Sequence, residues 1–350
     1  MTDPKLAPFT LHTTPYKTIQ GIPIPAHILI PKSISSASQT GKYPILIRFH
    51  GGFLVTGTAL YTEWLPNWAI NLVTQNSAIL IMPDYRLLPE ATGQEILEDL
   101  KDFWKWFGVG FPGYLAGISG NGKIGVNWEK VAVYGESAGG YLAIRSSLLD
   151  FSTDVVRDVD GMEFRGPKAV IAAYPMTMLR GKWYSEAGET KSPFGVPQFD
   201  GGILDTHIEG MGQGLERKMV ISVDPPARLE IAVTMVQRGR WTEIFERAGD
   251  EGLWLEDVIV GRSGVNEGGE REGKGAYLFT FHGMKDTAVP WEDTREWMEI
   301  WGRKFGENRV KGVWREGMEH GFDGEVEEES VEGKWLKEGL EEVKKEWLGN

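Results

Sequence analysis

One serine lies in a sequence pattern typical of a nucleophile. Residues 135–139 read Gly-Glu-Ser-Ala-Gly, a G-x-S-x-G match that a chain with 45 glycines produces by chance roughly a quarter of a time. The match follows a short β-branched run at 131–134 and precedes a helical pattern. Small residues suit a sharp strand-to-helix turn, which leaves the serine hydroxyl exposed above a sheet. We therefore predict a nucleophile elbow at Ser137 rather than a glycine-rich turn with an idle serine.

An imidazole and a carboxylate must activate such a serine at neutral pH, and in this architecture they follow it in the order Asp, His. Asp286 follows an apolar run at 277–281, and His320 follows one at 310–314. Of the six histidines, only His320 lies in a loop after the final strand with a flanking glycine. We therefore predict a catalytic triad of Ser137, Asp286 and His320. Weaker substitutes for the acid are Asp293, Asp323 and, weaker still, Glu292.

Acyl transfer also needs hydrogen-bond donors for the oxyanion, and backbone N–H groups supply them in many enzymes. His50-Gly51-Gly52-Phe53 leaves a buried-type strand, and glycines let the backbone approach a substrate. We predict an oxyanion hole made by the backbone N–H groups of Gly51, Gly52, Phe53 and Ala138. The ring of Phe53 is expected to face the pocket and narrow the space beside the scissile bond.

The elements that would position these residues alternate between extended apolar runs and helical patterns, which indicates an α/β fold. The predicted strands are 11–20, 22–31, 43–49, 78–82, 131–134, 169–174, 277–281 and 310–314. The predicted helices are 94–107, 141–149, 228–237, 241–248 and a C-terminal helix with an apolar stripe from Val331 to Trp347. The helix at 94–107 is expected to stop at the glycine-rich stretch that follows it.

A long segment breaks this alternation. Between Leu179 and Gly275 polar, glycine-rich loops surround one or two helical segments, and nearly a hundred residues exceed an ordinary connection. We predict a hydrolase-type core formed by residues 1–178 and 276–350, with residues 179–275 as a lid between the sixth and seventh strands. Its apolar side chains are expected to belong to a mobile cover rather than a core layer: Trp183, Tyr184, Phe194, Trp241 and Phe245.

Composition excludes several other classes of function. The net charge of −13 disfavours nucleic acid and anionic membrane surfaces as partners, and zero cysteines exclude disulfides and thiol chemistry. Histidines and carboxylates show no metal spacing, and the G-x-G-x-x-G at 108–113 follows a helix, so we expect neither a metal nor a dinucleotide cofactor. Residues 1–10 lack a signal-peptide pattern, and no apolar run reaches membrane-span length, which favours a cytoplasmic protein.

Together the motifs resemble the hormone-sensitive-lipase-like branch of the α/β-hydrolases. Five motifs occur in order: His50-Gly51-Gly52 with Gly57, the 84–90 segment DYRLLPE, Leu97-Glu98-Asp99, the elbow, and His320-Gly321-Phe322. The resemblance implies a mostly parallel sheet flanked by helices, no cofactor, and the triad and oxyanion groups named above. The sequence departs from the family in having Phe53 at the third glycine and Glu136 where Asp is common. It also lacks an N-terminal helical cap, whose covering role the insertion after Leu179 would take over.

These features favour a serine hydrolase that cleaves a small-molecule carboxylic ester through an acyl-enzyme. An alternative keeps the triad but resolves the acyl-enzyme with an internal nucleophile or acts on amides, giving lactonisation, cyclisation or amide cleavage. The degree of water exclusion by the lid would separate these two. A third hypothesis is a non-catalytic ligand receptor on the same fold, against which the intact Ser, Asp and His argue.

Overall fold

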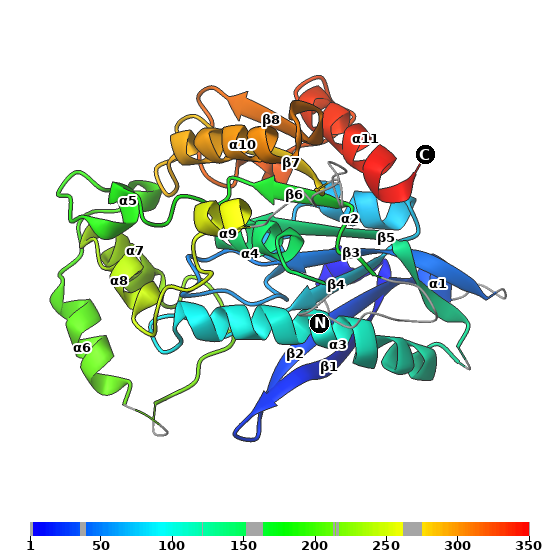
Figure 1. Cartoon of the computed structure of the whole chain (residues 1–350), viewed down its shortest axis with the longest axis horizontal. Coiled ribbons are helices and arrows are strands. Elements are labelled where there is room, and N and C mark those ends of the chain that lie inside the picture. Colours follow the sequence, from blue (N-terminus) through cyan, green and yellow to red (C-terminus); the bar gives the residue numbers. More distant parts are fainter. Residues whose placement is uncertain are drawn as a thin grey trace.

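A single mixed sheet forms the centre of the computed structural model, which describes residues 3–35, 40–120, 122–151, 164–212, 214, 217–261 and 275–349. In these residues the sheet has eight strands in the order β1-β2-β4-β3-β5-β6-β7-β8 (Figure 1). The strands are β1 (Phe9–Ile19), β2 (Ile22–Pro31), β3 (Gly41–Phe49), β4 (Ile79–Pro83), β5 (Ile124–Glu136), β6 (Ala169–Ala173), β7 (Tyr277–Gly283) and β8 (Val310–Arg315).

Six of these strands run parallel, from β4 through β3, β5, β6 and β7 to β8. Strands β1 and β2 form an antiparallel edge, with β2 paired to β4. This arrangement confirms the predicted α/β-hydrolase fold. Because the carboxyl ends of parallel strands meet at one edge of a sheet, the loops after β3, β5, β7 and β8 converge there.

Helices cover both faces of the sheet. The first face carries α3 (Gly93–Ile118), α4 (Ala138–Ser147) and α10 (Trp291–Phe305), and the second carries α2 (Asn67–Gln75) and α11 (Lys334–Leu348). Successive strand residues point to opposite faces, so Ile45 and Ile47 join the first core cluster while Leu46 joins the second. The remaining short elements outside the insertion are α1 (Lys32–Ser35) and 3₁₀ turns at Pro4–Leu6, Thr62–Trp64, Glu307–Arg309 and Phe322–Glu325.

Helix α3 does not end where the sequence analysis placed its end. It continues through the glycine-rich stretch and through Pro112 to Ile118. Phe107, Phe111 and Leu115 are fully buried at helical spacing, and this burial offsets propensity costs of about 1 kcal/mol for each Gly and about 3 kcal/mol for Pro. The G-x-G-x-x-G therefore lies inside a helix. At the C-terminus the apolar stripe is shorter than predicted, because Val331 precedes α11 and is 94% exposed.

The insertion, residues 179–275, supplies α5 (Lys182–Ser185), a 3₁₀ turn (Pro193–Gly195), α6 (Gly202–Gly210), α7 (Leu229–Gln237), α8 (Trp241–Glu246) and α9 (Leu255–Gly261). Helices α5 to α8 lie together at one end of the molecule, at the left of Figure 1. Residues 213, 215–216 and 262–274 of the insertion lie outside the described residues.

Three of its apolar side chains are not those of a mobile cover, and that expectation is wrong for them. Tyr184, Trp241 and Phe245 are fully buried in the same core cluster as α3 and α4. The polar loops around them hid this in the sequence, because burial depends on what the helices pack against. Only Phe194, at 41% exposure, and the partly buried Trp183 remain near the surface.

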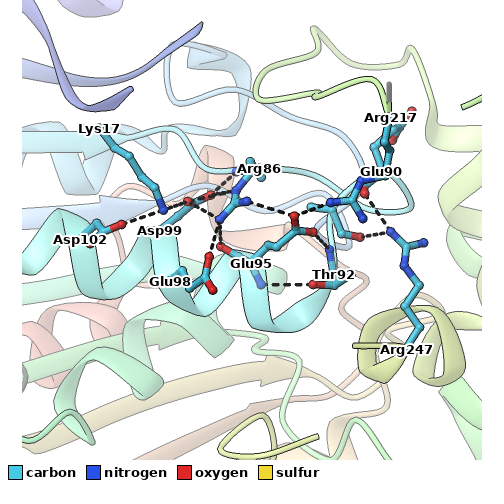
Figure 2. Close-up of polar contacts among 11 residues, drawn as sticks. Lys17, Arg86, Glu90, Thr92, Glu95, Glu98, Asp99, Asp102, Arg217 and Arg247 are labelled. Atoms are coloured by element: carbon cyan, nitrogen blue, oxygen red, sulfur yellow. Dashed lines mark hydrogen bonds and ion pairs between the residues drawn. The ribbon is translucent and has the colours of Figure 1, made fainter. Parts of the chain in front are cut away.

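A network of charged side chains fixes the start of α3 (Figure 2). Thr92 and Glu95 form a capping box, which satisfies N–H groups at the helix N-terminus. The Arg86 guanidinium contacts Glu95, Glu98 and Asp99. From the far side of the network, Lys17 on β1 contacts Asp99 and Asp102, while Arg217 and Arg247 approach from the insertion.

Within the described residues, no helix is long and apolar enough to cross a membrane.

Candidate active site

Ser137 sits on a sharp turn between β5 and α4. Its backbone has φ 56° and ψ −120°, a strained conformation for a residue with a side chain, costing about 1–3 kcal/mol. Neighbouring glycines make room for the turn: a Cβ on Gly135 would lie 2.1 Å from the Gly139 carbonyl oxygen, and one on Gly139 would lie 2.0 Å from that of Phe49. The serine N–H donates to the Ala173 carbonyl at 2.9 Å. This is the local geometry expected of a nucleophile elbow.

Asp286 and His320 follow neighbouring strands, β7 and β8, and their side chains meet. The His320 Nδ1 donates to Asp286 Oδ2 across 2.6 Å, which leaves Nε2 as the basic nitrogen. The other carboxylate oxygen, Oδ1, accepts the backbone N–H groups of Ala288 and Val289, each at 2.8 Å. Burial acts to raise the pKa of Asp286, but the charge of His320 and hydrogen bonds from His282 and His320 hold it below its usual range.

Ser137 and His320 line the same cavity of about 350 Å³. The described residues contain no hydrogen bond between the two side chains, and such catalytic bonds commonly tighten only when substrate is bound. The arrangement therefore brings together all three residues of the predicted triad, with the histidine already oriented by its acid.

The oxyanion groups are arranged differently from the prediction at one position. The Gly51 N–H donates to Glu136 Oε1 at 3.1 Å, so it is not available to an oxyanion. The N–H groups of Gly52, Phe53 and Ala138 have no hydrogen-bond acceptor among the described residues. Gly52 has φ +103°, and a Cβ there would lie 2.1 Å from the Thr56 carbonyl oxygen, so the loop requires glycine.

Glu136 is a residue of this site whose role the sequence analysis missed. Its carboxylate pairs with Arg48, at 2.5 Å for the Nη2–Oε1 contact and 3.2 Å for Nε–Oε2, and both side chains are buried. Because it also accepts the Gly51 N–H, Glu136 ties the elbow on β5 to the loop after β3. The only signal was an arginine within the otherwise apolar run at 44–49, which requires a buried partner.

His50 braces the same loop. Its ring stacks on Tyr85 with centroids 4.4 Å apart, and its Nδ1 donates to the Gly51 carbonyl at 2.8 Å. Burial lowers its pKa to about 4, so the imidazole is neutral at neutral pH. The Tyr85 hydroxyl donates to the His50 carbonyl at 2.6 Å, which fixes the loop from the segment after β4.

Among the four acids considered in the sequence, Asp286 is the one that contacts His320. Asp293 and Glu292 lie in the first turn of α10, and burial together with Glu296 and Glu292 raises the pKa of Asp293 to about 7. Asp323 is buried and lines the cavity, with Oδ2 accepting the Trp68 Nε1–H at 2.9 Å. Its Oδ1 has no hydrogen-bond partner among the described residues.

Aromatic side chains form the wall of the cavity. Phe53 is 1% exposed and lines it, with its ring 5.9 Å from that of Phe194 in an edge-on arrangement. Phe194, from the insertion, also packs against the His320 ring at 5.5 Å. Trp64 belongs to the lining, whereas Trp68 is fully buried and does not line the cavity. The described residues contain no cluster of three or more His, Asp or Glu side chains able to hold a metal ion.

Comparison with known sequences places this geometry in context. Residues 46–198 match a family model described as the alpha/beta hydrolase fold. The chain is 24% identical over 345 residues to a probable carboxylesterase M8 of a Phoma species, covering 98% of each chain. It is also 31% identical over 137 residues to human hormone-sensitive lipase, which is 39% of this chain and 11% of that protein.

Solved structures share the architecture. A Staphylococcus aureus protein of unknown function aligns with a TM-score of 0.57 at 18% identity, covering 94% of this chain and 98% of that one. Esterase 2 of Thermogutta terrifontis, in a structure phosphonylated by sarin, aligns with a TM-score of 0.53 at 16% identity, covering 96% and 93%. The sheet order, the elbow and these matches agree on the α/β-hydrolase fold, and the relatives that the chain resembles in sequence include a probable carboxylesterase and hormone-sensitive lipase.

Proposed function

We propose that this protein is a serine hydrolase that cleaves carboxylic esters, with Ser137 as the nucleophile, His320 as the base and Asp286 as its acid partner. The observation that carries the proposal is the 2.6 Å bond between Asp286 and His320, which lines a cavity together with Ser137. The similarity to a probable carboxylesterase over nearly the full chain supports the same activity.

The proposed reaction has two halves. Ser137 Oγ attacks the ester carbon while its proton passes to His320 Nε2, and the imidazolium then protonates the departing alcohol as the carbon–oxygen bond breaks. Water attacks the resulting acyl-enzyme with His320 again taking the proton, which releases the acid and restores Ser137. In both halves the N–H groups of Gly52, Phe53 and Ala138 would stabilise the oxyanion.

We also propose that the insertion forms one wall of the substrate site and contributes to substrate choice. Phe194 and Leu229 come from the insertion and line the cavity with Ser137 and His320. No feature of the described residues favours lactonisation, cyclisation or amide cleavage. The presence of Ser, His and Asp in a common site argues against a non-catalytic receptor.

A fluorophosphonate probe tests the proposal. We expect mass spectrometry to find the probe on the peptide containing Ser137, and Ser137→Ala to lose labelling together with about 10⁶-fold in kcat on a small activated ester. Ser185→Ala is the matched control, because Ser185 is exposed outside the cavity. The assignment would be contradicted if Ser137→Ala were still labelled while the variant of a different serine lost the label.

A further inference from the structure

The carboxylate of Asp286 is shared by two histidines. His320 Nδ1 lies 2.6 Å from Asp286 Oδ2, and His282 Nε2 lies 2.9 Å from the same oxygen. With the two backbone N–H groups on Oδ1, this gives the carboxylate four hydrogen-bond donors. His282 is fully buried at the end of β7, four residues before Asp286, and the mechanism proposed above does not use it.

The surroundings of His282 determine which of its nitrogens carries the proton. Nε2 faces the Asp286 carboxylate and, at 3.1 Å, the Val289 carbonyl, and both groups only accept hydrogen bonds. Nε2 must therefore be protonated. Burial lowers the pKa of His282, so the ring is neutral at neutral pH and Nδ1 carries a lone pair.

Thr294 on α10 completes the arrangement. Its Oγ1 is 2.9 Å from His282 Nδ1, so the hydroxyl donates to that lone pair and stabilises the tautomer with hydrogen on Nε2. The Pro175 carbonyl lies at 3.3 Å, the longer of the two contacts of this hydroxyl. A chain of directed bonds thus runs from Thr294 through His282 to the oxygen that orients His320.

The backbone of the two loops is held independently of this chain. Lys285 N–H donates to the Met318 carbonyl at 3.0 Å, and Met284 N–H donates to that of Arg315 at 2.9 Å. A Cβ on Gly283 would lie 2.3 Å from the Met318 carbonyl oxygen, so the loops are in close contact. Removing the His282 side chain would therefore leave the loops joined and would take away one of the two donors to Asp286 Oδ2, while Oδ1 keeps its two backbone N–H groups.

We infer that His282 is a positioning residue, which holds Asp286 Oδ2 in line with His320 through a neutral imidazole whose tautomer Thr294 fixes. The inference rests on the proposed function, because it assigns a purpose to the Asp286–His320 bond. A buried histidine that served only for packing would need neither the carboxylate contact nor the hydroxyl on its second nitrogen.

The test compares His282→Leu, which removes the donor, with His282→Gln, whose amide can donate to Asp286. A displaced catalytic group can cost about 100-fold in rate. We therefore expect the Leu variant to lower kcat on p-nitrophenyl acetate by about 10- to 100-fold, with KM nearly unchanged. The Gln variant should recover most of the loss. Without the His282 donor, Oδ2 carries more charge toward His320, so the acid limb of the kcat/KM profile should move to higher pH in the Leu variant.

Thr294 provides a second pair in case His282→Leu does not fold. Thr294→Val removes the hydroxyl at nearly constant shape and should lower kcat by about 3- to 10-fold, which is less than the roughly 100-fold cost of a misplaced group. Thr294→Ser keeps the hydroxyl and should retain most activity. Thr280→Val is the matched control, since Thr280 is also buried on β7 and donates to the Ala172 carbonyl at 2.8 Å. It should lower the melting temperature without moving the pH profile.

Active-site titration with the fluorophosphonate normalises each rate to the folded, labelled fraction. The inference is overturned if His282→Leu, or Thr294→Val where the former fails to fold, keeps wild-type kcat and pH profile while only the melting temperature falls. Failure of the proposed function looks different, because the wild-type protein would then show no turnover that depends on Ser137.

Discussion

The insertion is attached to the hydrolase core by two contrasting sets of contacts. The first, the apolar anchor, consists of Tyr184, Trp241 and Phe245, which are fully buried in the core. The rings of Trp241 and Phe245 stack with centroids 4.7 Å apart, and the Phe245 ring centroid lies 5.8 Å from that of Tyr141 on α4. The Trp241 Nε1–H donates to the Phe53 carbonyl at 2.9 Å. This side of the insertion is continuous with the core.

The second set, the polar anchor, joins His207, Arg217 and Arg228 of the insertion to Glu90 and Glu95 of the core. The Arg228 Nη2 lies 2.5 Å from Glu90 Oε2 and His207 Nε2 lies 2.8 Å from Glu90 Oε1. Arg217 pairs with Glu95 in the network at the start of α3 (Figure 2).

The two anchors differ in how strongly they depend on salt and pH. Apolar burial is insensitive to moderate salt and to pH. The pairs of the buried Glu90 carboxylate depend on pH but are screened little by salt, whereas the partly exposed Arg217–Glu95 pair weakens with salt. Leu229, which lines the cavity, directly follows Arg228. The wall of the substrate site therefore belongs to the responsive side, although the insertion as a whole is firmly attached.

The largest effect should come from cutting the apolar anchor. Trp241→Ala removes a fully buried indole and its hydrogen bond to Phe53, which should lower the free energy of unfolding by about 3–5 kcal/mol. Urea unfolding followed by fluorescence measures this, at low salt and at high salt, where the loss should be equal. Phe194→Ala, at a position 41% exposed, is the control, and an equal loss in both variants would refute the apolar anchor.

Cutting the polar anchor should have the next largest effect. Glu90→Gln leaves Arg228 without its carboxylate, and the free energy of unfolding should fall by about 2–3 kcal/mol, below the 3–5 kcal/mol of a fully buried pair, because the Arg228 side chain retains 12% exposure. Arg228→Met in the same chain should recover part of the loss. We also expect KM for a bulky ester to change more than KM for p-nitrophenyl acetate. A double variant no more stable than Glu90→Gln would argue against the pair.

The acid dependence of stability should identify the same carboxylate. Burial acts to raise the pKa of Glu90, but hydrogen bonds and charge from Arg228, with a further bond from His207, leave it below its ordinary value of 4.5. A lowered folded-state pKa stabilises the protein above about pH 4.5, and this contribution is lost as the pH falls further. The difference in melting temperature between wild type and Glu90→Gln should therefore shrink below pH 4.5. A difference that stayed constant down to pH 3 would exclude this cause.

The smallest effect is expected at Arg217. Its pair with Glu95 is partly exposed, at 27% and 22% for the two side chains, so Arg217→Ala should cost less than about 1 kcal/mol. The cost should vanish at about 1 M salt, where the screening length falls to about 3 Å. A cost that survived high salt would mean that Arg217 contributes by packing rather than by charge.

The sequence was most informative where chemistry is encoded over a few residues. The elbow at Ser137 and the loops carrying Asp286 and His320 follow from turn chemistry and from strand order. The structure places Ser137 and His320 on one cavity and Asp286 against His320. The assignment of their roles stays a prediction until labelling is done. Most strand positions were also predictable, because buried parallel strands are short apolar runs, but β5 begins at Ile124, seven residues before the predicted run at 131–134.

What the sequence did not reveal depends on contacts between distant segments. Glu136 takes the Gly51 N–H only because β3 and β5 are neighbours, which no local pattern specifies. Helix α3 continues through its glycines because Phe111 and Leu115 pack against the core. Trp241 and Phe245 appeared to be isolated apolar residues in a polar segment, yet tertiary packing makes them core.

The glycines of the elbow have a consequence for directed evolution. A side-chain carbon would lie 2.1 Å from backbone at Gly135, 2.0 Å at Gly139 and 2.5 Å from Pro175 at Gly140, so random libraries should return only glycine at these positions. Phe194 and Leu229 line the same cavity from the insertion, where replacement does not collide with the turn. Tolerance to substitution should therefore differ sharply between the elbow glycines and the cavity residues of the insertion. Variants with new substrate ranges should carry changes at Phe194 or Leu229, while the elbow glycines stay unchanged.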